Sequence, residues 1–338
     1  MKLAIVILNW NGQKFLEKFL PSLIKYNEDY AEIIIADNAS MDNSIDFLKE
    51  NYPQIKLIQN ESNGGFSKGY NDALSQIDAQ YYCLLNSDIE VDKNWIDPVI
   101  KLMDSDENIA VCQPKIRSYH EPEKFEYAGA AGGFIDKYGY PFCRGRMFMN
   151  LEVDEGQYDN VEEIFWGTGA CMFVRADLYQ KHGGLDNSFF AHMEEIDFCW
   201  RMKNLGYKIM YCPQSTVYHI GGGTLPKKSA RKTFLNFRNN MLLLYKNLPS
   251  KKLTWVFTVR FFLDIIAAVR FLFDSGFADF KAVFKAHIEF HKMKKHYVEY
   301  RKTAKHNNVS KIYQKNLVVS YYFRGIKKFS DIKNKDFS

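Results

Sequence analysis

The most constraining feature of this chain is a regular alternation of continuous apolar segments with helix-like segments. Four apolar segments, LAIVIL, EIIIAD, IKLIQN and YYCLLN, are separated by helical patterns near 13–26, 42–51 and 66–77. Strands that are apolar at every position, rather than at every second one, are typical of parallel sheets buried on both faces. We therefore predict an α/β fold whose mostly parallel sheet carries helices on both faces.

The same pattern resumes later in the chain. A strand ACMFV, a helix HMEEIDFCWRMKNLG and a strand YKIMYC fall within residues 166–219, whereas residues 118–165 are predicted to be rich in loops. In open α/β sheets, ligands bind at the carboxyl ends of the strands. Polar residues gather at these ends, at 9, 37–38, 60–63 and 86–88.

Charge divides the 338-residue chain into two parts. Residues 246–338 carry 20 Lys and Arg against 7 Asp and Glu, a net charge of +13, whereas residues 1–245 carry 25 against 33, a net charge of −8. A hydrophobic content of 46% supports a sizeable core and excludes a disordered chain. We predict a globular domain at 1–245 and a basic, helical C-terminal extension at 246–338 that meets an anionic surface.

The segment 255–273, WVFTVRFFLDIIAAVRFLF, is nearly all apolar but includes Arg260, Asp264 and Arg270. A bilayer span needs about 20 apolar residues, so three charges make a span a poor interpretation. We predict a helix in the headgroup region of a membrane. Apolar insertion is predicted for Trp255, Phe257, Phe261, Phe262 and Phe271. The alternative is a helix that packs against its own domain.

The six cysteines indicate a reduced protein. They form no C-x-x-C motif and no close pair, and Cys83, Cys171 and Cys199 lie in apolar segments, as small core residues do. The N-terminal MKLAIVILNW has too short an apolar stretch for a signal peptide and is predicted to be the first strand. We predict a cytoplasmic protein, peripheral on the inner face of the plasma membrane.

Two strand ends carry candidate nucleoside ligands. Asp37 can accept a hydrogen bond from the N3–H of uracil or thymine, while Asn38 and Ser40 shape the turn. Asn9 and Trp10 end the first strand, where the indole ring can lie against a base. The alternative for Asp37 is an Asx turn that caps the next helix.

The segment ESNGGFSKGYNDAL places glycines at the start of a helix. Backbone N–H groups at Gly64 and Gly65, together with Lys68, suit a diphosphate. The segment does not match G-x-x-x-x-G-K-[ST] and follows the third predicted strand rather than the first. Neither a P-loop nor a dinucleotide fingerprint therefore applies.

The candidate metal site is Asn86-Ser87-Asp88, at the end of an uninterrupted apolar strand. Mg²⁺ and Mn²⁺ take carboxylate and phosphate oxygens, so one Asp suffices when a substrate brings further ligands. His219 can complete the metal shell as a neutral imidazole, and the glycines at 221–223 allow a loop to close over a site. The alternatives are a strand-ending turn and a histidine without a metal.

An acidic cluster lies in AHMEEIDFCWR. In a helix, Asp197 and Arg201 are four residues apart and can form a structural ion pair. Glu194 and Glu195, near the helix start, remain available as a general base, because crowded carboxylates raise one another's pKa. The alternative is a solvated acidic helix face.

With these residues in view, the chain resembles an inverting family-2 glycosyltransferase of the GT-A fold, a Rossmann-like architecture, and most of all the bacterial rhamnosyltransferase-like group. The resemblance covers about residues 1–245. It rests on seven motifs in order: VILNWNG, IIADNAS, NGGFSKGYN, LLNSDIEV, GTGACMFVR, GGLDNSFFAHMEEIDFCWR and HIGGG.

The resemblance implies a role for each motif. Asp88 would hold the metal on the diphosphate with His219, and Glu195 would be the base, with Glu194 as the alternative. The nucleotide-sugar site would comprise Asn9, Trp10, Asp37, Asn38, Ser40, Asn63, Gly64, Gly65, Lys68, Asn71, Asn86 and Ser87. The GTGA turn would form part of the acceptor wall, with Trp166, Gly167 and Thr168.

The sequence departs from the family pattern in two places. The D-x-D motif is Asn86-Ser87-Asp88 here, so a single carboxylate remains and Asn86 is expected to contact ribose or a metal-bound water. The usual Asp of the base pair is replaced by Glu195, which is one methylene longer.

The implied reaction is metal-dependent, inverting transfer of a sugar from a nucleotide-diphosphate sugar to a hydroxyl of a glycan or lipid-linked acceptor, in surface-polysaccharide synthesis. dTDP-rhamnose is the favoured donor and UDP-sugars are second. The alternatives are an inactive sugar-nucleotide-binding protein and a nucleotidyltransferase, which would want a basic loop near the first strand. The acidic region argues against a nucleic-acid partner.

Overall fold

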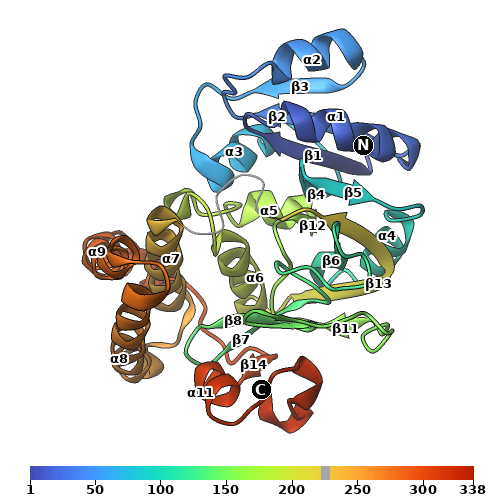
Figure 1. Cartoon of the computed structure of the whole chain (residues 1–338). Coiled ribbons are helices and arrows are strands. Elements are labelled where there is room, and N and C mark those ends of the chain that lie inside the picture. Colours follow the sequence, from blue (N-terminus) through green and yellow to red (C-terminus); the bar gives the residue numbers. More distant parts are fainter. Residues whose placement is uncertain (222–228) are drawn as a thin grey trace.

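A nine-stranded sheet forms the centre of the computed structural model, which describes residues 1–221 and 229–338 (Figure 1). Its strands lie in the order β11-β13-β6-β12-β4-β1-β2-β3, and β5 pairs with β13. Their bounds are β1 (Leu3–Asn9), β2 (Ala31–Asp37), β3 (Lys56–Gln59), β4 (Tyr81–Asn86), β5 (Ile89–Val91), β6 (Ile109–Ser118), β11 (Glu162–Glu163), β12 (Cys171–Arg175) and β13 (Lys208–His219).

The central strands are mostly parallel, as predicted. β1 pairs in parallel with β2 and β4, β2 with β3, and β6 with β13, whereas β12 is antiparallel to both of its neighbours. Helices cover both faces, which confirms the predicted α/β class. One core includes residues of α1 (Gln13–Lys25), α2 (Ser44–Asn51) and α4 (Asp97–Asp104), and the other includes α3 (Gly65–Leu74), α5 (Ala176–Lys181) and α6 (Glu194–Asn204).

Strand β1 explains why the apolar segments are continuous. Ile5 and Ile7 point into the core on the α1 side, and Ala4 and Val6 point into the core on the α3 side. Since each face of the sheet is covered by helices, both sets of side chains must be apolar. All six cysteines are buried and unpaired, consistent with the predicted reduced state.

Residues 118–165 form more regular structure than the sequence predicts. They contribute four strands to a small second sheet of order β10-β9-β8-β7-β14, within the described part of the chain. The bounds are β7 (Gly133–Asp136), β8 (Pro141–Cys143), β9 (Arg146–Met147), β10 (Asn150–Leu151) and β14 (Ile312–Tyr313). The short strands and intervening glycines lack the long apolar run by which the main strands are recognised.

The C-terminal residues fold back onto this second sheet. The backbone N–H of Leu317, at the start of α11 (Leu317–Tyr322), donates to buried Asp136 at 2.8 Å. The ring of Phe134 in β7 lies 4.8 Å from that of Phe329 and 5.3 Å from that of Phe337. The last thirty or so residues therefore share a core with β7 and β8.

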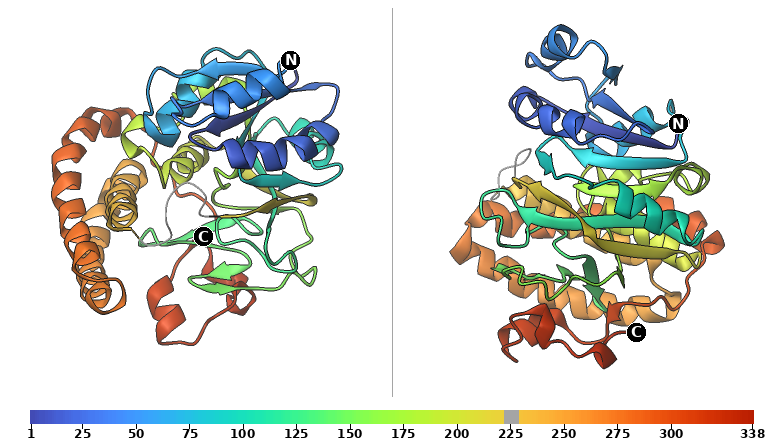
Figure 2. Two further views of the ribbon diagram at one scale, coloured as in Figure 1. Left: turned by 45° about the horizontal axis from the view of Figure 1, so that its top comes forward. Right: turned by 90° about the vertical axis from the view of Figure 1, so that its right-hand side faces the viewer.

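A layer of helices lies along one side of the two sheets (Figure 2). It begins with α7, ahead of the boundary predicted at 246, and α7 packs against both α6 and α9. The bounds of these helices are α7 (Ala230–Asn247), α8 (Ser250–Asp274), α9 (Phe277–Met293) and α10 (Val298–Thr303). Short 3₁₀ helices occur elsewhere along the chain as well as before α10: η1 (Asn187–Phe189), η2 (Lys294–Tyr297), η3 (Phe329–Asp331) and η4 (Asn334–Asp336).

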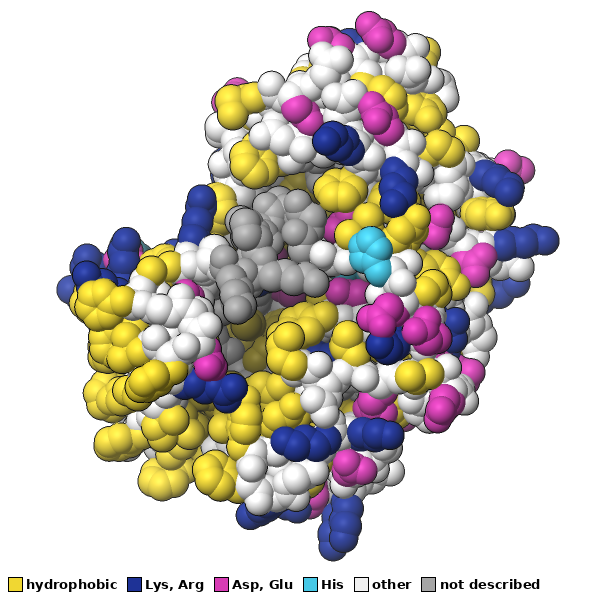
Figure 3. Space-filling model, viewed as in Figure 1, with side chains coloured by type: hydrophobic (Ala, Val, Ile, Leu, Met, Phe, Trp, Pro, Cys, Tyr) yellow, Lys and Arg dark blue, Asp and Glu magenta, His cyan; other side chains and the backbone are white. Residues whose placement is uncertain are grey.

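Helix α8 contains the predicted helix at 255–273. Its charged residues Arg260 and Asp264 are buried and paired with each other at 3.1 Å, so they do not face a headgroup region as the sequence suggested. Hydrophobic side chains gather instead on the exposed surface of this part of the molecule (Figure 3). Among the described residues, no helix has the length and apolar character needed to cross a bilayer.

Candidate active site

The ends of β1 and β2 bring the predicted nucleoside residues together. Asn9 and Asp37 occupy matching positions in the parallel pair, and the Asn9 side-chain amide donates to Asp37 at 3.0 Å and to Ser40 Oγ at 3.2 Å. The backbone N–H of Ser40, three residues on, donates to the other oxygen of Asp37 at 2.9 Å, and Asp37 does not cap the next helix, whose N-cap is Asn43.

Asp37 is fully buried beneath this turn, whereas Trp10 beside it is 39% exposed. The carboxylate thus already has partners within the protein, and the indole ring is open to a ligand. Asn9 keeps one buried side-chain oxygen without a partner. These contacts place the residues at one edge of the sheet, and contact with a base stays a prediction.

The backbone N–H groups at the start of α3 are hydrogen-bonded to oxygens of the protein itself. The backbone N–H of Gly65 donates to Asn63 at 2.9 Å, and the N–H of Phe66 donates to the carbonyl of Phe190 at 2.6 Å. Asn38 bridges Asn63 and the carbonyl of Gly65 at 3.0 and 3.2 Å. The N–H of Gly64 donates to the carbonyl of Ser62 at 3.0 Å, so both predicted backbone amides have partners within the protein, and their contact with a diphosphate stays a prediction.

Two further residues predicted for the nucleotide site serve other contacts. Asn71 donates to the carbonyl of Leu185 at 2.6 Å and to Asn187 at 2.7 Å, which ties α3 to the segment before α6. Lys68 pairs with Asp72 one turn away at 2.6 Å and is partly exposed. Asn71 therefore has a structural role in this arrangement.

Asp88 and His219 meet because β5 pairs with β13. His219 lies opposite Ile89 in this antiparallel pair, so the preceding Asp88 reaches the imidazole although the two residues are 131 positions apart. The His219 Nε2 atom lies 3.1 Å from Asp88 Oδ1, and both residues are buried. The two side chains are therefore in contact, and their role as metal ligands stays a prediction.

A third residue, Glu126, completes this group and was not predicted. Its carboxylate lies 3.3 Å from His219 Nδ1, at ion-pair distance but without hydrogen-bond alignment of the ring, and is 7% exposed. Burial lowers the pKa of His219 and the two carboxylates raise it, with a net pKa of about 10. The imidazole is therefore held between two carboxylates on opposite ring nitrogens.

The residue types of Asp88 and His219 suit a divalent cation, and a cation there would have to replace the proton that the raised pKa keeps on His219. Within residues 1–221 and 229–338, no group of three or more His, Cys, Asp or Glu side chains is arranged to hold a metal. Two protein ligands are nevertheless adequate for Mg²⁺ or Mn²⁺, since substrate phosphates and water supply the rest. A carboxylate on the far nitrogen, as Glu126 is here, is the usual partner of a ligating histidine.

Helix α6 begins with the two candidate bases. Glu194 is 4% exposed, Glu195 is partly buried, and each has one carboxylate oxygen that is buried without a hydrogen-bond partner. Burial and then the charge of Glu195 raise the pKa of Glu194 well above its ordinary value. Burial raises the pKa of Glu195 to about 7.

The backbone before α6 adopts an unusual conformation. Phe190, His192 and Met193 all have positive φ, at 65°, 71° and 74°, a conformation that non-glycine residues rarely hold without support. Asn239 of α7 supplies that support, since its amide donates to the carbonyls of Phe189 at 2.9 Å, of Ala191 at 2.9 Å and of His192 at 2.8 Å. Helix α7 thus fixes the direction in which the glutamates enter the site.

The GTGA turn joins the glutamates to the metal residues. A Cβ atom added to Gly169 would lie 3.0 Å from the ring of Phe66 and 3.9 Å from Cβ of Glu195, so the turn lies close to this candidate base. The carbonyl of the next residue, Ala170, accepts a hydrogen bond from the backbone N–H of Asn86 at 2.9 Å. Glu195 and the end of β4 therefore lie on two sides of one short turn.

The predicted acceptor wall is wrong for two side chains. Trp166 is 4% exposed and donates its indole N–H to the carbonyl of Phe134 at 2.9 Å, while its ring packs against Gly133. Thr168 is 2% exposed, and its N–H donates to Gln113 at 2.9 Å. Both side chains pack in the interior of the protein, and Gly167 is buried as well.

The loop predicted to close over the site contains Gly221, Gly222 and Gly223. Gly222 and Gly223 lie outside the described residues.

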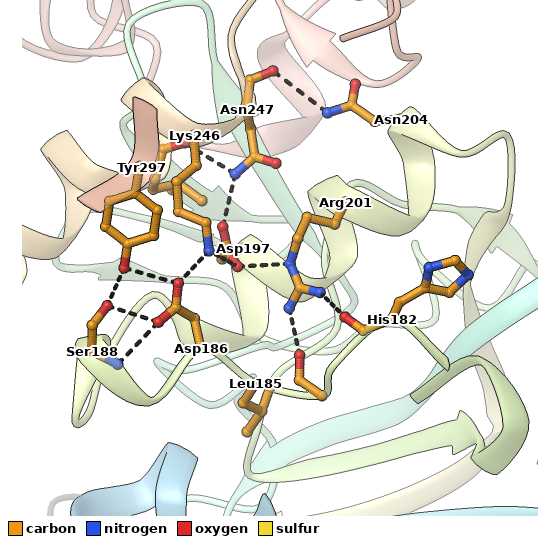
Figure 4. A network of polar contacts seen from close by, with 12 residues as sticks. His182, Leu185, Asp186, Ser188, Asp197, Arg201, Asn204, Lys246, Asn247 and Tyr297 are labelled. Carbon is orange, nitrogen blue, oxygen red and sulfur yellow. Dashed lines mark hydrogen bonds and ion pairs between the residues drawn. The ribbon is translucent and has the colours of Figure 1, made fainter. Parts of the chain in front are cut away.

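A network of ion pairs and hydrogen bonds joins α6 to α7 (Figure 4). Asp197 accepts hydrogen bonds at 2.8 Å from Arg201, as predicted, and also from Lys246 and Asn247 of α7. Lys246 reaches Asp186 as well, at 2.6 Å. Burial raises the pKa of Asp186 and Lys246 lowers it, to about 2.

Comparison with known proteins agrees with the geometry. The family model described as Glycosyl transferase family 2 matches residues 4–181. An N-acetylglucosaminyl-diphospho-decaprenol L-rhamnosyltransferase of Mycobacterium tuberculosis is 24% identical over 64% of this chain and 75% of its own. The rhamnosyltransferase WbbL of Escherichia coli is 22% identical over 64% of this chain and 82% of its own.

Among solved structures, that of GalNAc-T7 with UDP, GalNAc and Mn²⁺ superposes with a TM-score of 0.58 at 16% identity. The match covers 90% of this chain but only 57% of that one, and it shows that the two share the GT-A fold. The family model, the relatives and the fold agree on one assignment: the chain belongs to glycosyltransferase family 2, in its rhamnosyltransferase-like group, and is a glycosyltransferase.

Proposed function

We propose that this enzyme transfers a sugar from a nucleotide-diphosphate sugar to an acceptor hydroxyl with inversion at the anomeric carbon, and that Glu195 is the general base. The observation that carries the proposal is that Glu194 and Glu195 each keep a buried carboxylate oxygen without a partner, and that Glu195 lies beside the turn whose Ala170 carbonyl bonds the end of β4. Leaving buried carboxylate oxygens unsatisfied is costly, and such groups mark sites of chemistry.

The pKa values favour Glu195 over Glu194 as the base. Adjacent buried carboxylates resist being ionised together, so the one with the lower pKa loses its proton first. Burial raises the pKa of Glu195 to about 7, whereas the pKa of the more deeply buried Glu194 is raised by burial and also by the charge of Glu195, which favours Glu195 as the proton acceptor. A pair of acids whose pKa values are pushed apart is typical of a division of roles.

In the proposed reaction, the Glu195 carboxylate takes the proton of the acceptor hydroxyl. The oxygen then bonds to the anomeric carbon from the face opposite the diphosphate, and the bond between that carbon and the diphosphate oxygen breaks with its electron pair. Asp88 and His219 would hold Mg²⁺ or Mn²⁺, which when bound offsets the charge on the diphosphate leaving group. Glu126 orients the imidazole from its other side.

On the nucleoside side, we propose that Trp10 lies against the base while Asn9, Asp37, Asn38 and Ser40 form the wall that recognises its edge. Trp10 is the exposed member of this set, and the others support the turn behind it. We assign Asn86 and Ser87, which precede Asp88 in the sequence, to contacts with the ribose or the phosphates. These assignments extend the family motifs to this chain residue by residue.

The favoured donor is dTDP-rhamnose, with UDP-sugars second. Both relatives named above are rhamnosyltransferases, and the Mycobacterium tuberculosis protein is named for a diphospho-decaprenol acceptor. We therefore propose a lipid-linked or glycan acceptor of surface-polysaccharide synthesis, met on the cytoplasmic face of a membrane. Residues 1–245 would form the catalytic site, and residues 246–338 would bind the membrane surface.

The stereochemistry of the product tests this proposal. Proton NMR of the glycoside formed from an α- or β-linked donor should show the opposite anomeric configuration, because a single displacement inverts the centre. Retention of configuration would contradict a single-base mechanism. The Glu195→Gln variant serves as the control for non-enzymatic donor breakdown.

A further inference from the structure

Helix α8 is amphipathic in the reverse of the usual sense. Its buried face carries Val256, Arg260, Asp264 and Ala268, spaced four residues apart. Its exposed side carries an apolar stripe of Trp255, Phe262, Ile266, Val269 and Phe273, which are between 45% and 84% exposed. A helix that only packs on a soluble domain has these two faces exchanged.

The inward charges hold α8 in this orientation. Arg260 donates to the carbonyl of Tyr138 at 2.9 Å and lies over the ring of Tyr140 at 4.3 Å, and His287 of α9 lies 3.1 Å from Asp264. Breaking such a buried set is expensive, so the helix cannot readily turn its apolar stripe inward. The exposed stripe is therefore a fixed property of the fold.

Helix α9 extends the apolar surface. α8 and α9 pack together, with the rings of Phe257 and Phe290 stacked at 5.2 Å. Phe277, Phe284 and Ile288 are exposed on α9 by 59%, 40% and 59%. Phe257 and Phe271, predicted to insert into a membrane, are instead partly buried, and Phe271 packs on Phe237.

We propose that this docking face, the exposed side of α8 and α9, lies on an anionic membrane surface. Contiguous apolar surface of this extent on a protein marks a binding site. The lysines around it decide the partner, because a basic amphipathic helical face suits anionic headgroups. Exposed lysines at its margins are Lys251, Lys252, Lys281, Lys285, Lys292 and Lys295.

The same lysines disfavour a second copy of this chain as the occupant. Two docking faces in contact would bring like charges together around an apolar centre, which opposes association. A lipid-linked acceptor, part of the proposed function, would bring the enzyme to a membrane. The docking face depends on the proposed function only through this lipid-linked acceptor. The residues of the docking face are not the proposed catalytic residues.

The experiment is co-sedimentation of the full chain with vesicles of phosphatidylglycerol and phosphatidylcholine, without donor or acceptor. The wild type should bind, more weakly as salt rises, and a Phe262→Ser, Ile266→Ser, Phe273→Ser variant should bind roughly tenfold or more weakly. The matched control is Ile24→Ser, Val153→Ser, Val161→Ser, which changes three exposed apolar residues elsewhere and should bind as the wild type does.

Three outcomes would overturn the docking face. They are no binding of the wild type at low salt, equal binding of the Phe262 variant, and binding to phosphatidylcholine alone as tight as to the anionic mixture. A wild-type dimer that the variant converts to a monomer, without vesicle binding, would identify a second copy as the occupant. Donor turnover in detergent-free buffer is measured separately, so failure of the catalytic proposal is distinguishable.

Discussion

At the residue scale, the central feature is the different environment of two neighbouring glutamates. Glu194 is buried more deeply than Glu195, and Cβ of Glu195 lies beside the GTGA turn. The sequence placed both in a site but left open which of them is the base. Burial separates them, and burial is a tertiary property that no local pattern in AHMEEIDFCWR reports.

Glu195→Gln should lower turnover about 10²–10⁴-fold with little change in donor binding, because removal of a general base costs that much. In the wild type the rate should rise as pH passes through about 7, since Glu195 must be deprotonated to accept a proton. A pH–rate profile of both enzymes measures this. If Glu194→Gln loses turnover and Glu195→Gln does not, the base is Glu194.

Asp88→Ala should abolish turnover that Mg²⁺ or Mn²⁺ supports, and higher metal concentration should not restore it. The reason is that Asp88 is the single carboxylate of the Asn-Ser-Asp motif, and His219 beside it would be the other protein ligand. Chelator should likewise stop the wild type, reversibly. Full turnover in excess chelator would contradict the metal site.

At the element scale, α7 and the network beneath α6 determine where the glutamates lie. Asn239 and Lys246 were missed from the sequence because each is an ordinary polar residue of a helix, and the residues around α6 that it bonds are at least forty-seven positions away. Glu126 was missed for the same reason, since it meets His219 through β6 and β13. By contrast, Asp88 and His219 were found, because both stand at strand ends.

Lys246→Met should destabilise the fold by about 3 kcal/mol or more, because it removes the cation that buried Asp197 and partly buried Asp186 share. Urea unfolding followed by circular dichroism measures this. The matched control is Lys302→Met, which removes an exposed ion pair with Glu299 and should cost less than about 1 kcal/mol. Equal effects of the two changes would contradict the structural role of Lys246.

At the scale of the whole molecule, the strand–helix alternation of the first hundred residues was predictable because the spacing of apolar residues within each segment indicates its secondary structure. The organisation of the tail was not. Its charge of +13 suggested a separate extension, yet β14 joins the second sheet and Asp136 receives the N–H of Leu317. The inward turn of Arg260 likewise depends on Tyr138 and Asn240, distant residues that periodicity does not reveal.

A chain cut near Leu253 should therefore lose more than its docking face. Removal of β14 and of the rings that pack on Phe134 exposes the second sheet, so the truncated protein should aggregate or melt at a lower temperature than the full chain. Size-exclusion chromatography and thermal denaturation test this. A truncated protein that stays monomeric with an unchanged melting temperature would show that the tail is an independent unit.

The central claim, sugar transfer from a nucleotide-diphosphate donor by Glu195, is tested most directly by a donor screen. The measurement is release of nucleotide diphosphate from a panel of dTDP-, UDP- and GDP-sugars in Mg²⁺, with wild type and Glu195→Gln side by side. We predict release from dTDP-rhamnose first and UDP-sugars second, nearly lost in the variant. No release from any donor, or equal release by both proteins, would contradict the account.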